Sequence, residues 1–213
     1  MRKWIAPLLI VVSVMFTAAV YSQLPDRIAT HFGVNGPDRW SGRSAAWLFP
    51  AIAFGIWALL TTIPRIDPHR ANYAKFQSSY DTMVIASTLV TVLVQFAVLG
   101  SAIGWPVRVE SVVPFAVGGL FIVIGELLPR SSPTWFFGIR TPWTLSNDIV
   151  WQRTHRLGGF LMIIAGLLLM SLAVLRSRTA VYTVIALTGV LVLSTVPYSY
   201  FVYRSVTAGK HSS

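Results

Sequence analysis

Two apolar runs joined by a polar loop decide the fold class: SVVPFAVGGLFIVIGELL (residues 111–128), GIRTPWTL (138–145) and LGGFLMIIAGLLLMSLAVL (157–175). A helix rises about 1.5 Å per residue, so about 20 apolar residues cross the roughly 30 Å hydrocarbon core of a bilayer. Both runs approach that length, and their only acid, Glu126, lies near an end. We therefore expect two transmembrane helices joined by an ordered loop.

Four more apolar runs bring the predicted spans to six, and the fold class is an all-α integral membrane protein with two long ordered loops. Hydrophobic residues make up 54% of the sequence and charged residues 11%, against roughly 25% charged in soluble domains. The first run lacks a small-residue cleavage site, so we expect it to be retained. The predicted spans are Trp4–Tyr21, Ala46–Ile63, Thr82–Ile103, Ser111–Leu128, Leu157–Leu175 and Val181–Tyr203.

Basic residues predict the orientation. The chain has 17 Lys and Arg against 7 Asp and Glu, a formal charge of +10. These cations lie mainly in loops, which favours contact with anionic lipid headgroups over nucleic acid. With the N-terminus inside, eleven of the 17 lie on the cytoplasmic side and six outside. We therefore predict a multi-pass protein of the bacterial cytoplasmic (inner) membrane with both termini cytoplasmic.

Two long connections divide the chain into two three-helix modules. Their Trp, Phe and Pro content argues for order, and loops of this length are often functional. Each follows the first helix of its half and contains Thr-His, at Thr30-His31 and Thr154-His155. One hypothesis is therefore a 3+3 inverted repeat of the kind found in transporters. The modules are residues 1–110 and 111–213, and the loops are residues 23–45 outside and 129–156 inside.

The outer loop contains a strong turn signal at residues 35–38, NGPD, because Gly permits a positive φ and Pro fixes φ. His31 and Phe32 are candidates for ligand contact, and the alternative is a packed extracellular cap. Neighbouring opposite charges suggest two local ion pairs, Asp26 with Arg27 and Asp38 with Arg39.

The cytoplasmic loop concentrates residues suited to a specific polar contact. Arg140 has a planar fork of five N–H donors that matches a carboxylate or a phosphate, and Thr141 and Thr144 offer hydroxyls beside it. Three prolines stiffen the loop. Ser146 is predicted to cap the following helix, with Asp148 in its first turn.

Helical spacing extends this site beyond the loop. Trp151, Thr154 and His155 share one helix face with Gly158, and that face would meet the bundle or a ligand. Trp143 is a further candidate in the loop. Both tryptophans also fit interfacial anchors, and the arginines also fit positive-inside residues.

Glu126 is expected to pair with an arginine, because an unpaired carboxylate near the hydrocarbon edge is costly. Arg130 and Arg140 are the two possible partners. Pairing with Arg140 would make the loop site structural.

Neither a metal site nor a cofactor is predicted, and we expect a protein that is not an enzyme. The sequence has no Cys, and its four His residues are scattered without the spacing of ligand pairs. It contains no P-loop, dinucleotide-binding glycine pattern or nucleophile elbow. Gly100 and Gly104 form a small-xxx-small pair, which predicts close helix packing.

The sequence resembles the SdpI family of bacterial membrane proteins, whose founding member protects a cell from a secreted peptide toxin. The likeness to the family's C-terminal module runs from Gly125 to about Gly166, and the outer loop resembles a module of unknown function that often precedes it. The residues that carry the likeness are Pro129, Gly138–Leu145, Trp151, Thr154–Arg156 and Gly159 in the first, and Leu24-Pro25, Ile28, His31-Phe32, Gly36 and Asp38 in the second.

This resemblance implies an inner-membrane immunity or envelope-stress protein that binds an amphipathic peptide toxin or a lipid. The founding member also holds a transcriptional repressor at the membrane, so a cytoplasmic repressor is an expected partner. The outer loop or a cavity in the bundle would bind the peptide or lipid, and the inner loop around Arg140 would report this binding or hold a cytoplasmic partner. The candidate ligand- or partner-binding residues are Arg140, Thr141, Trp143, Thr144, Trp151, Thr154, His155, Glu126, His31 and Phe32.

Two alternatives remain. A small transporter would need a polar pathway through the spans, for which Gln95, Ser194, Thr195 and scattered Ser and Thr residues are available. A membrane enzyme acting on lipid phosphates would place His155 and Arg140 at the interface, although no nucleophile is evident.

Overall fold

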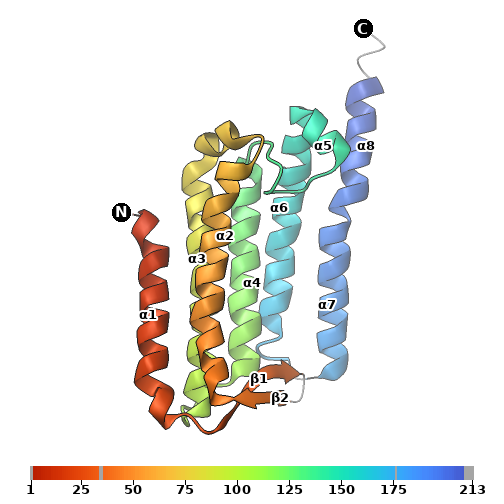
Figure 1. Cartoon of the computed structure of the whole chain (residues 1–213). Coiled ribbons are helices and arrows are strands. Elements are labelled where there is room, and N and C mark those ends of the chain that lie inside the picture. Colours follow the sequence, from red (N-terminus) through yellow and green to blue (C-terminus); the bar gives the residue numbers. More distant parts are fainter. Residues whose placement is uncertain (1, 34–35, 176, 209–213) are drawn as a thin grey trace.

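The computed structural model describes residues 2–33, 36–175 and 177–208, and it confirms the predicted all-α membrane fold. In this part of the chain six helical segments are long and apolar enough to cross a bilayer. The last segment consists of two helices that follow one another (Figure 1). The helices are α1 (Ile5–Val20), α2 (Leu48–Ile66), α3 (Gln77–Ala102), α4 (Val109–Leu127), α5 (Pro142–Ser146), α6 (Asp148–Ser171), α7 (Arg178–Leu193) and α8 (Thr195–Ala208).

The surface of the bundle is that of a membrane protein. Leu8, Leu59 and Leu193 are each more than 60% exposed, and they belong to α1, α2 and α7. Such widespread apolar exposure would be unfavourable in water, whereas it suits contact with lipid chains.

Turns of 3-10 helix extend or connect the spans: η1 (Arg2–Trp4), η2 (Tyr21–Gln23), η3 (Arg43–Trp47), η4 (Arg70–Phe76) and η5 (Leu128–Arg130).

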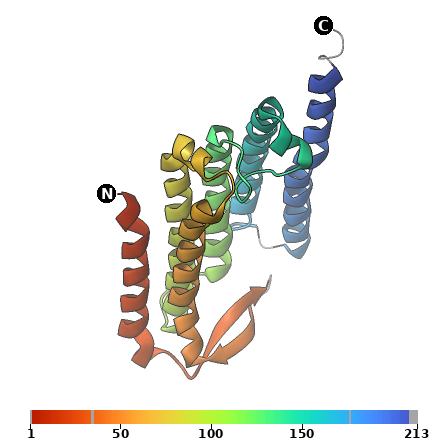
Figure 2. The same ribbon diagram turned by 45° about the horizontal axis from the view of Figure 1, so that its top comes forward.

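The two ends of the bundle differ. Figure 1 shows the start of α1, the end of α8, the α2–α3 connection and the α4–α6 connection at one end, which we call the loop end. A β-hairpin of β1 (Arg27–Gly33) and β2 (Gly36–Gly42) lies at the opposite end, the hairpin end. The tilted view shows this hairpin extending from the α1–α2 side toward the C-terminal helices (Figure 2).

The outer loop is therefore a folded element, which the sequence pattern did not predict. The predicted turn does fall at the hairpin, where Gly36 has a φ of 104°, although Asn35 lies outside the described residues. Ile28 is fully buried and packs with Leu24, Ala46 and Leu99. This apolar contact anchors the hairpin to the bundle.

The predicted ion pairs in the outer loop are wrong. Asp26 pairs with Arg43 at 3.0 Å, and Asp38 pairs with His31 at 2.5 Å. Successive side chains of an extended chain point to opposite faces, so each acid finds its partner across the hairpin and not beside it in the sequence.

The closest helix packing joins α4 to α6 through two pairs of glycines. A Cβ on Gly118 would lie 2.5 Å from the carbonyl oxygen of Gly166, and a Cβ on Gly125 would lie 2.6 Å from that of Gly159. In each helix the two glycines are two turns apart, so one antiparallel seam carries both contacts. Small residues at such a seam let two backbones approach within van der Waals contact.

The predicted small-xxx-small pair does not pack two helices together. Gly100 lies under the ring of Trp105, and Gly104 follows the end of α3 with a φ of 91°. The pair therefore shapes a tight helix end, because the second glycine is outside the helix.

A buried polar cluster joins α1 to α3. Gln95 is fully buried, and its Nε2 donates to the Ser13 carbonyl oxygen at 2.9 Å and to Thr17 Oγ1 at 2.6 Å. The Ser13 hydroxyl in turn donates to Gln95 Oε1. These bonds satisfy the amide inside the bundle, as a buried polar group requires.

The two Thr-His pairs lie in unlike surroundings. Thr30 and His31 are exposed on a strand, whereas Thr154 and His155 are fully buried on a helix. The matching dipeptides therefore give the inverted-repeat hypothesis no structural support.

Adjacent glycines on α4 test the glycine seam. We expect Gly118→Ala to destabilise the protein by about 1–3 kcal/mol, because the new methyl group meets the α6 backbone. Gly119→Ala is the matched control, since a Cβ there meets nothing within 4 Å. The measurement is the free energy of unfolding in detergent. Equal effects of the two substitutions would refute the tight seam.

Candidate functional site

The loop between α4 and α6 lies over the end of α6 and is held by short-range caps. Thr141 caps α5 in a reciprocal arrangement with Thr144: each side-chain oxygen accepts from the other residue's backbone N–H, at 3.2 and 2.8 Å. Asn147 caps α6 through the N–H groups of Ile149 and Val150. The prediction of Ser146 as this cap is wrong, because Ser146 already belongs to α5.

His155 fastens this loop to α6. Its Nε2 accepts the Ile139 backbone N–H at 2.8 Å, and its Nδ1 lies 2.8 Å from the carbonyl oxygen of Trp151. An N–H can only donate and a carbonyl can only accept, so the geometry requires the neutral ring with its proton on Nδ1. The ring also stacks on Trp151 with centroids 3.9 Å apart, and both side chains are fully buried.

Gly138 makes this close approach possible. Its φ is 101°, and a Cβ there would collide with the His155 ring and lie 2.9 Å from the Trp151 ring. Only glycine combines this backbone conformation with the missing side chain at low cost. The loop thus rests directly on the two stacked rings.

The predicted helix face of Trp151, Thr154 and His155 exists, and it faces the protein interior. Trp151 Nε1 donates to the Ser131 carbonyl oxygen at 3.1 Å. Thr154 Oγ1 is buried with no hydrogen-bond partner among the described residues. Trp151 and His155 thus support the loop from beneath, and all three side chains are buried in this structure.

Trp143 joins the loop to α8. Its Nε1 donates to Ser199 Oγ at 2.5 Å, and its ring meets the edge of Tyr200 at 5.3 Å. Thr141 Oγ1 lies 3.4 Å from the same serine hydroxyl. The sequence pattern gave no sign of Ser199 as a partner, because it lies in an apolar span 56 residues away.

Arg140 is exposed, and its Nη1 donates to the Trp135 carbonyl oxygen at 2.6 Å. This bond leaves most of the guanidinium fork open to solvent. Glu126 pairs with Arg130 at 3.2 Å, one helical turn along, and not with Arg140. The pair is exposed on both sides, so its contribution to stability is small.

Asp67, which sequence reasoning missed, holds the loop from the N-terminal module. It is only 2% exposed. Its Oδ2 accepts the Tyr73 hydroxyl at 2.9 Å and the backbone N–H groups of Trp135 and Phe136 at 3.0 and 3.2 Å. Its Oδ1 accepts the His69 N–H at 2.7 Å. In the sequence, Asp67 is an acid directly before Pro68, and this pattern is typical of an ordinary turn. It therefore gave no indication of the role of Asp67 in holding the loop.

Two further contacts reinforce this link between the modules. Asn72 Nδ2 donates to the Pro133 carbonyl oxygen at 2.7 Å. Phe137 stacks on Phe76, with centroids 5.8 Å apart, and meets Tyr80 edge-on. Residues 133–137 are therefore fixed by the α2–α3 connection, while residues 138–144 are fixed by α6 and α8.

A groove of about 800 Å³ lies at the hairpin end. Phe32 and His31 line it from β1, and much of the rest comes from α3, α4, α7 and the turn that follows α6. Most of this lining is apolar: Val98, Val113, Pro114, Leu172, Val181 and Ile185. Arg108 and Glu110 add charge at the start of α4, and a Cβ on Gly36 of the hairpin would lie 3.6 Å from Glu110 Oε1.

The candidate residues thus separate into two places. Seven lie at the loop end, Glu126 lies nearby in an exposed pair, and His31 and Phe32 lie at the groove. Among the described residues no three His, Asp or Glu side chains gather in a way that could hold a metal ion. The seven at the loop end are Arg140, Thr141, Trp143, Thr144, Trp151, Thr154 and His155.

Residues 130–199, which include this loop and its supports on α6 and α8, match the SdpI/YfhL protein family. Over these residues the chain is similar to that family. Residues 8–54, which include the hairpin, match the Domain of unknown function (DUF1648). The chain is also 24% identical to the Immunity protein SdpI of Bacillus subtilis (strain 168), over 99% of its own length and 100% of that relative. No solved structure matches it.

These findings confirm the predicted resemblance to the SdpI family and support a membrane immunity role. The family match covers the loop and its supports on α6 and α8, and the relative is similar from end to end. With six candidate spans, the chain is a multi-pass membrane protein.

Asp67 provides the sharpest test of the loop architecture. We expect Asp67→Asn to destabilise the protein by about 2–3 kcal/mol and to speed hydrogen exchange at the Trp135 and Phe136 amides. The reason is that an amide presents an NH₂ group to donors that now lack an acceptor.

Glu126→Gln is the control, since its exposed pair should contribute less than about 1 kcal/mol. Unfolding in detergent and exchange by mass spectrometry give the two readouts. Unchanged exchange at both amides in Asp67→Asn would show that Asp67 does not hold the loop.

Proposed function

We propose that this protein is an immunity protein of the bacterial cytoplasmic membrane that captures an amphipathic peptide toxin in the groove at the hairpin end. The groove beneath the hairpin is the observation that carries the proposal. A membrane-active peptide has one apolar and one polar face. Such a peptide would insert its apolar face between the helices and leave its polar face toward the rim.

The chemistry of the groove suits that occupant. Val113 of α4, Ile185 of α7 and Leu172, directly after α6, form an apolar surface. Arg108 and Glu110 lie where the groove meets the hairpin, and His31 with its partner Asp38 lies on the hairpin itself. Burial of the apolar face would supply most of the affinity, and the rim charges would select the polar face.

The distribution of polar groups favours binding over transport. Gln95 is fully satisfied by α1. The hydroxyls of Ser194 and Thr195 donate to carbonyl oxygens of their own helix turn. These three polar side chains of the spans are thus already hydrogen-bonded within the protein. An enzymatic role at the loop end is also disfavoured, because the His155 ring is buried and both of its nitrogens are bonded.

We further propose that the loop end reports an occupied groove to a cytoplasmic partner such as a transcriptional repressor. The groove is lined by α4 and by the turn that directly follows α6, and Ser111 Oγ of α4 donates to the Ala173 carbonyl oxygen of that turn at 2.8 Å. The same two helices are joined along the glycine seam up to the loop. In the loop, Trp135 and Phe136 are 50% and 45% exposed, and Arg140 bonds to Trp135. These three side chains form the surface on which the cytoplasmic partner would dock.

The proposed orientation puts this docking surface and both termini in the cytoplasm and the groove outside. It follows from the excess of Lys and Arg on the loop-end side. A secreted peptide would then reach the groove without crossing the membrane.

Filling the groove should abolish protection. We expect Val113→Trp to occupy space that the peptide needs and to reduce survival of a sensitive strain by at least tenfold when it is challenged with a panel of secreted amphipathic peptides. Val190→Trp is the matched control, because Val190 lies on α7 and is 66% exposed. Colony counts at equal membrane abundance give the result. Full protection by Val113→Trp against every peptide that wild type resists would remove the groove as the binding site.

Arg140→Lys should impair the contact with the cytoplasmic partner without impairing peptide binding in the groove. It keeps the positive charge but loses the planar fork that bonds the Trp135 carbonyl and is open to a partner. We expect normal membrane abundance and normal survival, with faster hydrogen exchange in residues 135–140 and loss of a cytosolic protein from the membrane fraction. Arg153→Lys, also exposed at this end, is the control. Retention of the same cytosolic proteins by both variants would argue against a partner at Arg140.

A further inference from the structure

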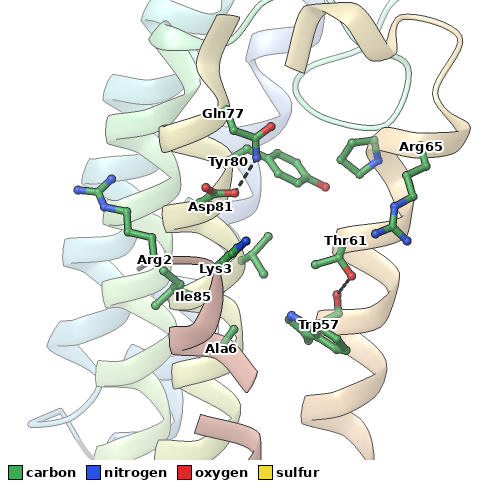
Figure 3. A pocket seen from close by; sticks show the side chains of 12 residues that line it. Arg2, Lys3, Ala6, Trp57, Thr61, Arg65, Gln77, Tyr80, Asp81 and Ile85 are labelled. Carbon is green, nitrogen blue, oxygen red and sulfur yellow. Dashed lines mark hydrogen bonds between the residues drawn. The ribbon is translucent and has the colours of Figure 1, made fainter. Parts of the chain in front are cut away.

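A second, smaller hollow lies at the loop end, on the N-terminal side of the bundle. It is a cleft of about 290 Å³ between the start of α1, the end of α2 and the start of α3. Neither the groove nor the α4–α6 loop contributes to its lining. Its walls combine basic side chains with an apolar floor, as Figure 3 shows.

Two cations face each other across this cleft. Figure 3 shows the Lys3 ammonium on the α1 side and the Arg65 guanidinium on the α2 side. Neither forms an ion pair with any residue that the structure describes. Two unneutralised cations around one hollow create a local positive potential that attracts an anion.

The remaining polar groups are already bonded to the protein. Arg2 points away from the cleft in Figure 3 and donates to Ser78 Oγ at 2.5 Å, which ties the start of the chain to α3. Asp81 accepts from Gln77 Nε2 at 2.7 Å on the same helix. Asp81 is the only acid in the lining, so the cleft keeps an excess of positive charge.

The floor of the cleft is apolar. Ala6 and Val84 are buried there, and Trp57 and Ile85 lie beside them. Tyr80, which also lines the cleft, is buried and donates its hydroxyl to the Leu60 carbonyl oxygen at 2.7 Å. The same two helices expose apolar side chains farther along the bundle, Leu8 on α1 and Leu59 on α2.

We infer that this cleft binds an anionic phospholipid, with the headgroup phosphate between Lys3 and Arg65 and an acyl chain along the α1–α2 surface. A free phosphate would use the cations but gain nothing from the apolar floor. A zwitterionic lipid would use the floor but bring a positive group to a positive site. Basic pockets between transmembrane helices bind anionic headgroups on the same physical grounds. The inference is independent of the proposed groove.

The experiment uses the full chain in a neutral detergent and counts bound lipid by native mass spectrometry. Phosphatidylglycerol and phosphatidylcholine of equal chain length are added separately, and inorganic phosphate is added as a competitor. We expect phosphatidylglycerol to bind in preference to phosphatidylcholine and to resist competition by phosphate.

Two pairs of substitutions locate the lipid. Lys3→Gln with Arg65→Gln should weaken phosphatidylglycerol binding about 25-fold, since each cation near an anionic headgroup contributes about fivefold. Arg153→Gln with Arg156→Gln removes the same charge from exposed positions at the same end and should have little effect. Asp81→Asn, which removes the one acid, should strengthen binding severalfold.

Three results would overturn the inference. Equal binding of the two lipids would show that the cleft does not select a lipid by the charge of its headgroup. Equal loss in both double variants would show a nonspecific surface effect. Displacement of phosphatidylglycerol by inorganic phosphate at a similar concentration would show a phosphate site with no lipid component.

Discussion

The glycine seam between α4 and α6 is the contact on which the rest of the C-terminal half depends. Glycines at 118 and 125 meet glycines at 166 and 159 at backbone distance, so the two helices form one unit. In lipid there is no hydrophobic driving force for apolar side chains to associate. Van der Waals contact between the helix backbones therefore stabilises the pair instead. The unit reaches from the groove at one end of the bundle to the loop at the other.

The loop end shows how polar residues are accommodated at a membrane surface. His155 and Asp67 are buried there, and each bonds to backbone N–H groups of the loop, Ile139 in one case and Trp135 and Phe136 in the other. Their side chains come from the two halves of the chain, so the loop is bonded to both. Several residues that carry the likeness to the SdpI family support this loop, whereas Arg140 is exposed.

The groove and the cleft lie at opposite ends of the bundle, and their linings suit different ligands. The groove at the hairpin end has an apolar bed and a charged rim, whereas the cleft at the loop end has a basic mouth and a small floor. Under the proposed orientation, the first meets secreted peptides and the second meets the inner leaflet. A lipid bound between α1 and α2 would steady the N-terminal module, to which Asp67 ties the reporting loop.

The sequence by itself determined the six spans, the turn at Gly36 and the helix face shared by Trp151 and His155, because these follow from local length, composition and periodicity. Only the tertiary structure decided the partners. Arg140, predicted to meet a ligand or Glu126, bonds Trp135, and Asp67 carries a role that no local pattern shows. The β-hairpin and its cross-strand ion pairs were also not predicted from the sequence. Such contacts join segments far apart in the chain, so which groups meet depends on packing that no short stretch of sequence contains.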